Sequence, residues 1–80
     1  MTFPMFEDVI VTANQPAHNI RAGDVGIVVE RHVIDGKEDG YSVEFFDRIG
    51  QTVAVLTLSS SQLRLPTNSD RLTVRASNHQ

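Results

Sequence analysis

The sequence predicts an all-β fold, a small barrel of five short strands. Short runs of β-branched and aromatic residues recur along the chain, and each is bounded by Gly, Asp, Asn, Ser or Pro, which favour turns. No stretch has both the length and the apolar periodicity of an amphipathic helix. The clearest of these runs is Ala-Gly-Asp-Val-Gly-Ile-Val-Val-Glu at residues 22–30.

The first strand is expected at residues 8–12, where a β-branched run is flanked by polar residues. Residues 13–21 are too polar and too interrupted for a strand, because they contain Pro16 and two asparagines, and they predict a long loop. Gly23 and Asp24 then predict a turn into the second strand.

The second strand is expected at residues 25–33 and contains Gly26. A glycine inside a strand predicts a bulge or a tight bend, here where the barrel turns a corner. A hairpin connection follows at residues 35–40, because Asp35 and Gly36 form a dipeptide that tolerates left-handed backbone.

The third strand is expected at residues 41–46, where Tyr41, Val43 and Phe45 alternate with polar residues and should face the core. Residues 47–51 predict a turn, with Gly50 in the left-handed position. The fourth strand, residues 52–58, is apolar enough to predict a central place in the sheet.

The serines at residues 59–61 predict one turn of 3-10 helix before a short fifth strand, residues 63–65, which closes the barrel and ends at Pro66. This order of elements is typical of an SH3-like barrel, which we place at residues 1–66. The polar residues 67–80 predict a flexible C-terminal tail. The alternative is a sixth strand at residues 72–75, paired within its own chain or with a neighbour, and a homodimer is therefore one expected state.

The composition limits the class of protein. Eighty residues form one domain near the lower limit for a self-sufficient core, and such a domain often gains stability from a partner. The chain has no cysteine, which excludes disulfides and fits a reducing cytosol. We expect no signal peptide and no membrane span, because there is no basic leader and no run of about 20 apolar residues. The expected location is the cytoplasm.

The charge distribution argues against nucleic acid as a partner. The formal net charge is −3, and the seven Lys and Arg residues are spread along the chain with acids beside several of them. Nucleic-acid binders usually gather a basic surplus on one face, because phosphate neutralisation supplies much of their affinity.

No pattern for catalysis, a metal or a cofactor is present in the sequence. The three histidines lack the spacing of a metal site, and His32 is expected to be a solvated residue at a strand end. The serines lack the glycines of a nucleophile elbow, and no glycine run precedes a Lys-Ser or Lys-Thr pair. We therefore expect a protein that is not an enzyme and that holds no cofactor and no metal.

The candidate partner-binding residues are carboxylates around the third strand and one aromatic residue. Carboxylates steer the approach of a basic partner, and aromatic residues are enriched at the centres of interfaces. Phe46 has two open interpretations: it points outward as part of an interface, or a bulge turns it back into the core. The candidates are Asp35, Glu38, Asp39, Glu44, Phe46 and Asp47.

Several blocks together resemble the small bacterial family called domain of unknown function 4926. They are Asp-Val-Ile at residues 8–10, Gly-Asp-Val-Gly-Ile-Val-Val-Glu at residues 23–30, Glu-Phe-Phe-Asp at residues 44–47 and Ser-Gln-Leu-Arg at residues 61–64. The resemblance covers residues 7–65 and implies an SH3-like barrel without an assigned activity. It also implies genes beside other small genes, in the manner of toxin–antitoxin or immunity pairs.

A second resemblance concerns residues 23–30 alone, which are similar to the glycine-bearing strand of ribosomal and elongation-factor barrels that touch RNA. This chain lacks the basic residues that flank the strand in those proteins. The expected function is a non-enzymatic protein-binding module, the antitoxin or immunity partner of a neighbouring small protein that carries basic charge. The alternatives are a small barrel that binds RNA or nucleoprotein, and an accessory domain of a larger enzyme complex.

Overall fold

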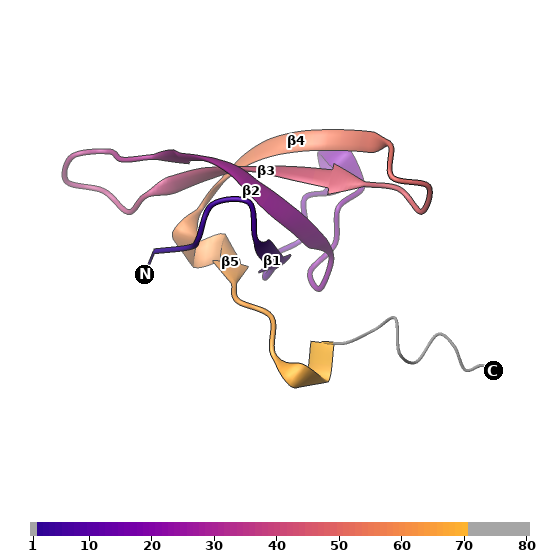
Figure 1. Ribbon diagram of the computed structural model, residues 1–80. Helices are drawn as coiled ribbons and strands as arrows, with labels where there is room; N and C mark the ends of the chain where they lie inside the picture. Colours follow the sequence, from indigo (N-terminus) through magenta and orange to yellow (C-terminus); the bar gives the residue numbers. More distant parts are fainter. Residues whose placement is uncertain (1, 71–80) are drawn as a thin grey trace.

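The computed structural model describes residues 2–70, and these residues form the predicted all-β fold (Figure 1). The strands are β1 (Asp8–Val11), β2 (Val25–His32), β3 (Gly40–Phe46), β4 (Thr52–Ser59) and β5 (Leu63–Arg64). Single 3-10 turns occur at η1 (Pro16–His18), η2 (Ser60–Gln62) and η3 (Asn68–Asp70). Each strand begins and ends within one residue of its predicted bounds, and η2 precedes the last strand as expected.

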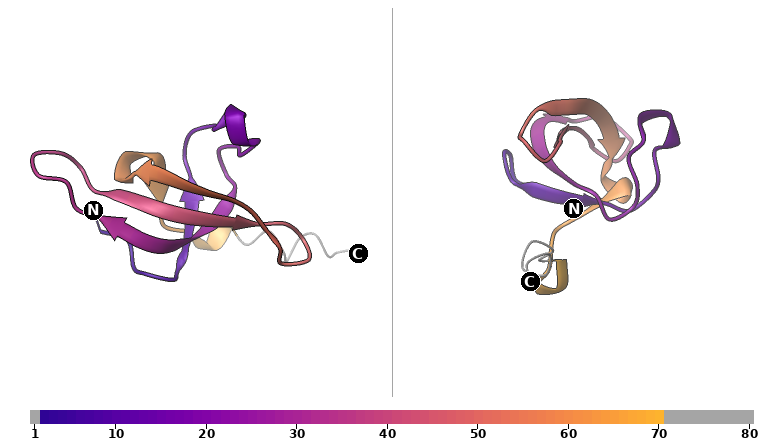
Figure 2. Two further views of the ribbon diagram at one scale, coloured as in Figure 1. Left: turned by 90° about the horizontal axis from the view of Figure 1, so that it is seen from above. Right: turned by 90° about the vertical axis from the view of Figure 1, so that its right-hand side faces the viewer.

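The strands form one antiparallel sheet in the order β4-β3-β2-β1-β5, which curls into a half-barrel (Figure 2). The first strand lies between the second and the last, with Val9 opposite Gly26 and Val11 opposite Leu63. This is the strand order expected of an SH3-like barrel.

The prediction that the fourth strand is central was wrong, because β4 is an edge strand. Leu56 and Leu58 on one face of β4 are buried in the core, whereas Val53 and Val55 on the other face are exposed. The apolar composition of β4 therefore reflects two apolar faces, of which the core explains only one.

The alternation predicted for the third strand is confirmed. Tyr41, Val43 and Phe45 are all buried in the core that fills the curl of the sheet. The remaining buried side chains of this core are Phe3, Val9, Val11, Ile20, Val28, Leu56, Leu58 and Leu63.

Phe3 is a core residue that the sequence pattern did not reveal. Its side chain is only 2% exposed, and its ring meets that of Tyr41 edge to face with 5.2 Å between centroids. The backbone N–H of Phe3 donates to the Tyr41 hydroxyl oxygen at 3.1 Å. The N-terminal segment is thus fixed to the third strand by packing and by a buried hydrogen bond.

Gly26 does not form a bulge, which was one of the two alternatives predicted for it. The register shift in β2 lies later, between Val28 and Glu30. At Gly26, a Cβ atom would overlap Val43 Cγ1 and would lie 2.9 Å from Phe45 Cε1. Glycine is needed there because two core side chains of the neighbouring strand occupy the space of its missing side chain.

The predicted turns at Gly36 and Gly50 are confirmed, with φ of 73° and 86°. The segment expected as a loop, residues 13–21, contains η1 and a bridge between Gln15 and Ile20. Residues 68–70, at the start of the expected tail, form η3. The alternative strand at residues 72–75 lies outside the described residues.

Candidate functional site

Two of the candidate carboxylates in the β2–β3 hairpin are engaged within the chain. Asp39 accepts hydrogen bonds from Arg31 Nε at 2.9 Å and Nη2 at 2.6 Å, which pairs the hairpin's two arms. Glu38 accepts from the backbone N–H of Ser61 at 2.7 Å and from the hydroxyls of Ser60 and Ser61 at 2.9 Å and 3.2 Å. Asp35, at the tip, is exposed.

Glu38 therefore joins the β2–β3 hairpin to the turn before the last strand. The hydrogen bond from the Ser61 backbone is the largest cause that lowers the pKa of Glu38, followed by the two serine hydroxyls. Each of these donors stabilises the ionised carboxylate, so the folded state is favoured while Glu38 is charged.

We expect the Glu38→Gln variant to lower stability at neutral pH and to lose this effect in acid. The folded-state pKa of Glu38 lies below its ordinary value of 4.5, so its stabilisation is complete above that pH and is lost as the pH falls through the folded value. Urea unfolding of both proteins at neutral pH and below pH 4 measures the difference. Asp35→Asn is the matched control, and an equal loss in both variants would contradict the role of the serine contacts.

The remaining two carboxylates lie at the other end of β3. Asp47 Oδ1 accepts from the backbone N–H groups of Ile49 at 3.0 Å and Gln51 at 2.9 Å, which shapes the β3–β4 turn. Glu44 accepts from the hydroxyl of Thr52 on β4. These donors are neutral groups, so the contacts position both carboxylates without pairing them with a cation.

The predicted site residues fall into two groups rather than one patch. Asp35, Glu38 and Asp39 precede β3, whereas Phe46 and Asp47 lie at its end. A strand of seven residues separates the two groups by on the order of 20 Å, and the two hairpins project from opposite ends of the molecule (Figure 2).

Phe46 combines parts of both interpretations. A register shift lies between Phe45 and Phe46, so the bulge is present. Phe45 takes the core position, however, and Phe46 remains 40% exposed instead of turning inward. The extra residue of the bulge is Val53 on β4, and the ordinary alternation of β3 places its two consecutive aromatic residues in different environments.

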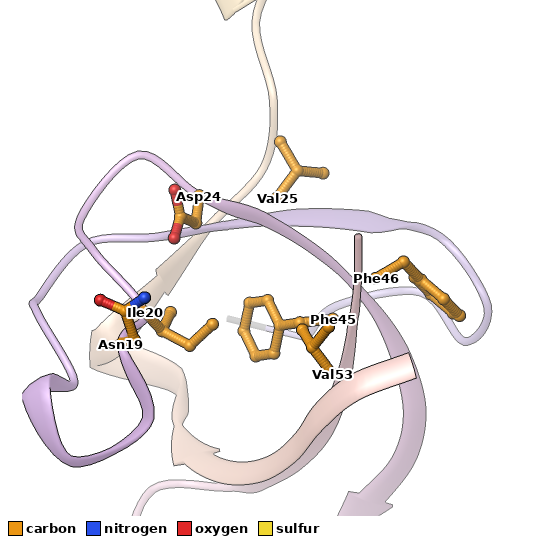
Figure 3. Close-up of a pocket in the computed structure, with 7 residues that line it drawn as sticks. All are labelled: Asn19, Ile20, Asp24, Val25, Phe45, Phe46 and Val53. Atoms are coloured by element: carbon orange, nitrogen blue, oxygen red, sulfur yellow. The ribbon is translucent and has the colours of Figure 1, made fainter. Parts of the chain in front are cut away.

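Beside this bulge lies a cleft of about 290 Å³ at the open end of the half-barrel (Figure 3). The Phe45 ring points toward Ile20 of the β1–β2 loop, and Val53 at the start of β4 lies next to the ring. The lining residues are Asn19, Ile20, Asp24, Val25, Phe45, Phe46 and Val53.

The cleft has a mixed lining, in which apolar side chains stand beside Asn19, Asp24 and other polar atoms. Ile20 and Phe45 are buried, while Val25 and Val53 are exposed at the surface. Asp24 Oδ2 accepts from the Arg21 backbone N–H at 2.9 Å, so this carboxylate shapes its own turn. The volume of the cleft lies at the lower end of the 300–1,000 Å³ range typical of small-molecule sites.

Sequence reasoning missed the contribution of the β1–β2 loop to this cleft. Ile20 is the one large aliphatic residue among residues 13–21, and that isolation in a polar segment was the available signal. Asn19, next to it, has a φ of 58°, a left-handed conformation that asparagine tolerates better than most residues. This conformation ends η1 just before the chain turns back toward the cleft.

His32 is half-buried, which corrects the expectation of a solvated histidine. Its Nε2 lies 2.8 Å from Ser42 Oγ, while its Nδ1 is 3.9 Å from Glu30 Oε2. Ser42 Oγ also lies 3.4 Å from Thr57 Oγ1, and Ser42 is 8% exposed. The chain of contacts supplies partners for a buried hydroxyl, as buried polar groups require.

The described residues hold neither a metal-ligand cluster nor a membrane-spanning helix. Within residues 2–70, no group of three or more His, Cys, Asp or Glu side chains is arranged to hold a metal ion. In the same part of the chain, no helix combines the length and the apolar character of a membrane span.

Comparison with known proteins identifies a family. No curated protein and no solved structure matches the chain. A family match covers residues 5–65, which include every strand, all of the cleft and all six predicted site residues. The chain therefore belongs to the family described as Domain of unknown function (DUF4926).

Proposed function

We propose that this chain is a non-enzymatic protein-binding module that holds an apolar side chain of its partner in the cleft beside Phe46. The observation that carries the proposal is the gathering of exposed apolar side chains around a small cleft. Phe46 and Val53, which both line the cleft, are 40% and 58% exposed. Apolar surface of this kind, next to a concave site and rimmed by charge, is typical of interfaces.

The charges around the cleft define the partner's chemistry. Asp24 lines it, Asp47 follows Phe46 directly, and the chain as a whole has a formal net charge of −3. Neutral backbone groups hold both carboxylates in place, so an approaching basic surface meets charges whose positions are already fixed. The proposed partner therefore presents an apolar anchor surrounded by Lys or Arg.

A small basic toxin, or the target of an immunity protein, would meet this description, and in that role the chain would neutralise its partner by covering it. The acidic β2–β3 hairpin is too far from the cleft to contact the same apolar side chain of the partner. Its carboxylates act in this proposal through long-range attraction, which raises the association rate more than the affinity.

The test is capture of partners from the native lysate with the tagged full chain, followed by titration of the recovered protein. Phe46→Lys, which places a charge at the cleft, is expected to weaken binding by about tenfold or more, which corresponds to about 1.4 kcal/mol. Val33→Lys is the matched control, since Val33 is also exposed but lies beyond the end of β2.

Three results would contradict the proposal. Equal binding by Phe46→Lys and by the parent would exclude the cleft as the binding site. Recovery of RNA without a protein, with an affinity that falls steeply with salt, would favour the RNA-binding alternative. A fixed stoichiometry with one large enzyme, unaffected by the cleft variant, would favour an accessory domain.

A further inference from the structure

The two edges of the sheet differ sharply in how they are protected. The edge formed by β5 is only two residues long, carries Arg64 and is followed closely by Pro66. Short length, charge and proline are the features by which natural proteins prevent edge strands from pairing with other chains. The opposite edge, β4, has none of them.

The composition of β4 is neutral throughout. Its eight residues, Thr-Val-Ala-Val-Leu-Thr-Leu-Ser, include no charged residue, no proline and no glycine. The only irregularity is the bulge at Val53 near its start, so residues 54–58 can accept a further strand without repulsion or interruption.

The outer side of β4 is available in the described part of the chain. Among residues 2–70, the backbone of residues 52–58 forms its hydrogen bonds with β3 alone. Only the last residue has another partner, since the Ser59 N–H donates to Gln62 Oε1 at 3.0 Å. Because alternate residues of an edge strand point outward, about four N–H and four C=O groups remain to be paired.

We propose that two copies of this chain pair through β4 in antiparallel orientation, which joins their sheets across a two-fold axis. The neutral composition of β4 favours a second copy of the same strand as its pairing partner. A basic partner, as proposed for the cleft, gains no charge complementarity from β4, whereas an identical neutral strand meets it without repulsion.

The exposed face of β4 supports the same pairing. Val53 and Val55 are 58% and 55% exposed and project from the face that does not cover the core. In an antiparallel pair, Val55 packs against its counterpart from the second copy, and cross-strand pairs of β-branched residues stabilise a sheet. The pairing thus accounts for the apolar face of β4 that the core leaves unexplained.

Hydrogen exchange of the full chain at low and high protein concentration tests the pairing directly. We expect the outward-pointing amides of residues 52–58 to exchange more slowly at high concentration, together with sedimentation as a dimer. The variant Val55→Lys places two like charges near the axis and should raise the dimer dissociation constant by about tenfold or more. Val33→Lys should leave it unchanged.

Two outcomes would overturn the proposal. Protection of these amides that does not vary with concentration, in a protein that sediments as a monomer, would mean that residues 71–80 of the same chain cover the edge. Rapid exchange at every concentration would mean that the edge stays unpaired. Since Val55 does not line the cleft, Val55→Lys separates failure of the dimer from failure of the cleft, which Phe46→Lys reports.

Discussion

Replacing Gly26 with alanine is expected to lower the free energy of unfolding by about 3 kcal/mol. The new Cβ would overlap Val43 Cγ1 and would lie 2.9 Å from Phe45 Cε1, both in side chains that are fully packed in the core. A domain of this size is stable by only about 4–12 kcal/mol, so the loss is a large share of the total. Thermal and urea unfolding measure it.

The matched control is Gly40→Ala, because a Cβ at Gly40 would meet its nearest neighbour, His32 Cβ, at an ordinary 3.7 Å. A second variant tests the cause. If overlap with Val43 is responsible, then Val43→Ala should cost less in the Gly26→Ala background than alone, with a coupling of about 1 kcal/mol or more. Additive losses in the double variant would show that overlap with Val43 does not cause the destabilisation by Gly26→Ala.

Removing the Phe3 side chain should have an effect of similar or greater size. Phe3→Ala is expected to cost about 3–5 kcal/mol, the range for a buried phenylalanine, because the ring fills the core against Tyr41. Denaturant unfolding of the full chain measures the loss, with Phe6→Ala as control, since Phe6 is exposed. An equal effect in the two variants would mean that Phe3 contributes no more than a surface residue.

The hydrogen bond at the same place can be separated from the packing. Tyr41→Phe keeps the ring but removes the acceptor of the Phe3 N–H, and leaving that buried donor unpaired should cost about 1–3 kcal/mol. The aromatic contact and the hydrogen bond together explain why residues near the N-terminus belong to the domain.

The strands could be predicted because their signals are local. Alternation at Tyr41, Val43 and Phe45 needs only the two-residue period of a strand, and Gly36 and Gly50 need only the left-handed backbone of a turn. The turn at Asp47 could be predicted for the same reason. An aspartate that accepts from backbone N–H groups two and four residues later is a local turn feature.

The errors concern relations between distant segments. The apolar composition of β4 indicates burial, but the same composition suits an edge whose outer face is apolar. The reason for Gly26 lies in Val43, on another strand, and no local pattern contains that contact. In each case the decisive neighbour is set by strand order and register.

The candidate site was only partly predictable for the same reason. Phe46 was identified from its place at the end of an alternating strand, and it lines the cleft. The opposite wall, Ile20, is contributed by a loop far away in the sequence. Glu38 shows the converse: its charge suggested a partner, whereas its hydrogen bonds go to Ser60 and Ser61 in the same chain.

The place of β1 between β2 and β5 has a consequence for biosynthesis. The strand β1 pairs with β2, β2 with β3 and β3 with β4, so each of these pairs can form as its second strand leaves the ribosome. The outer edge of β1, by contrast, stays open until Leu63 and Arg64 have been made. Until then the nascent domain carries an unpaired edge at β1, which Leu63 and Arg64 cover once they have been made.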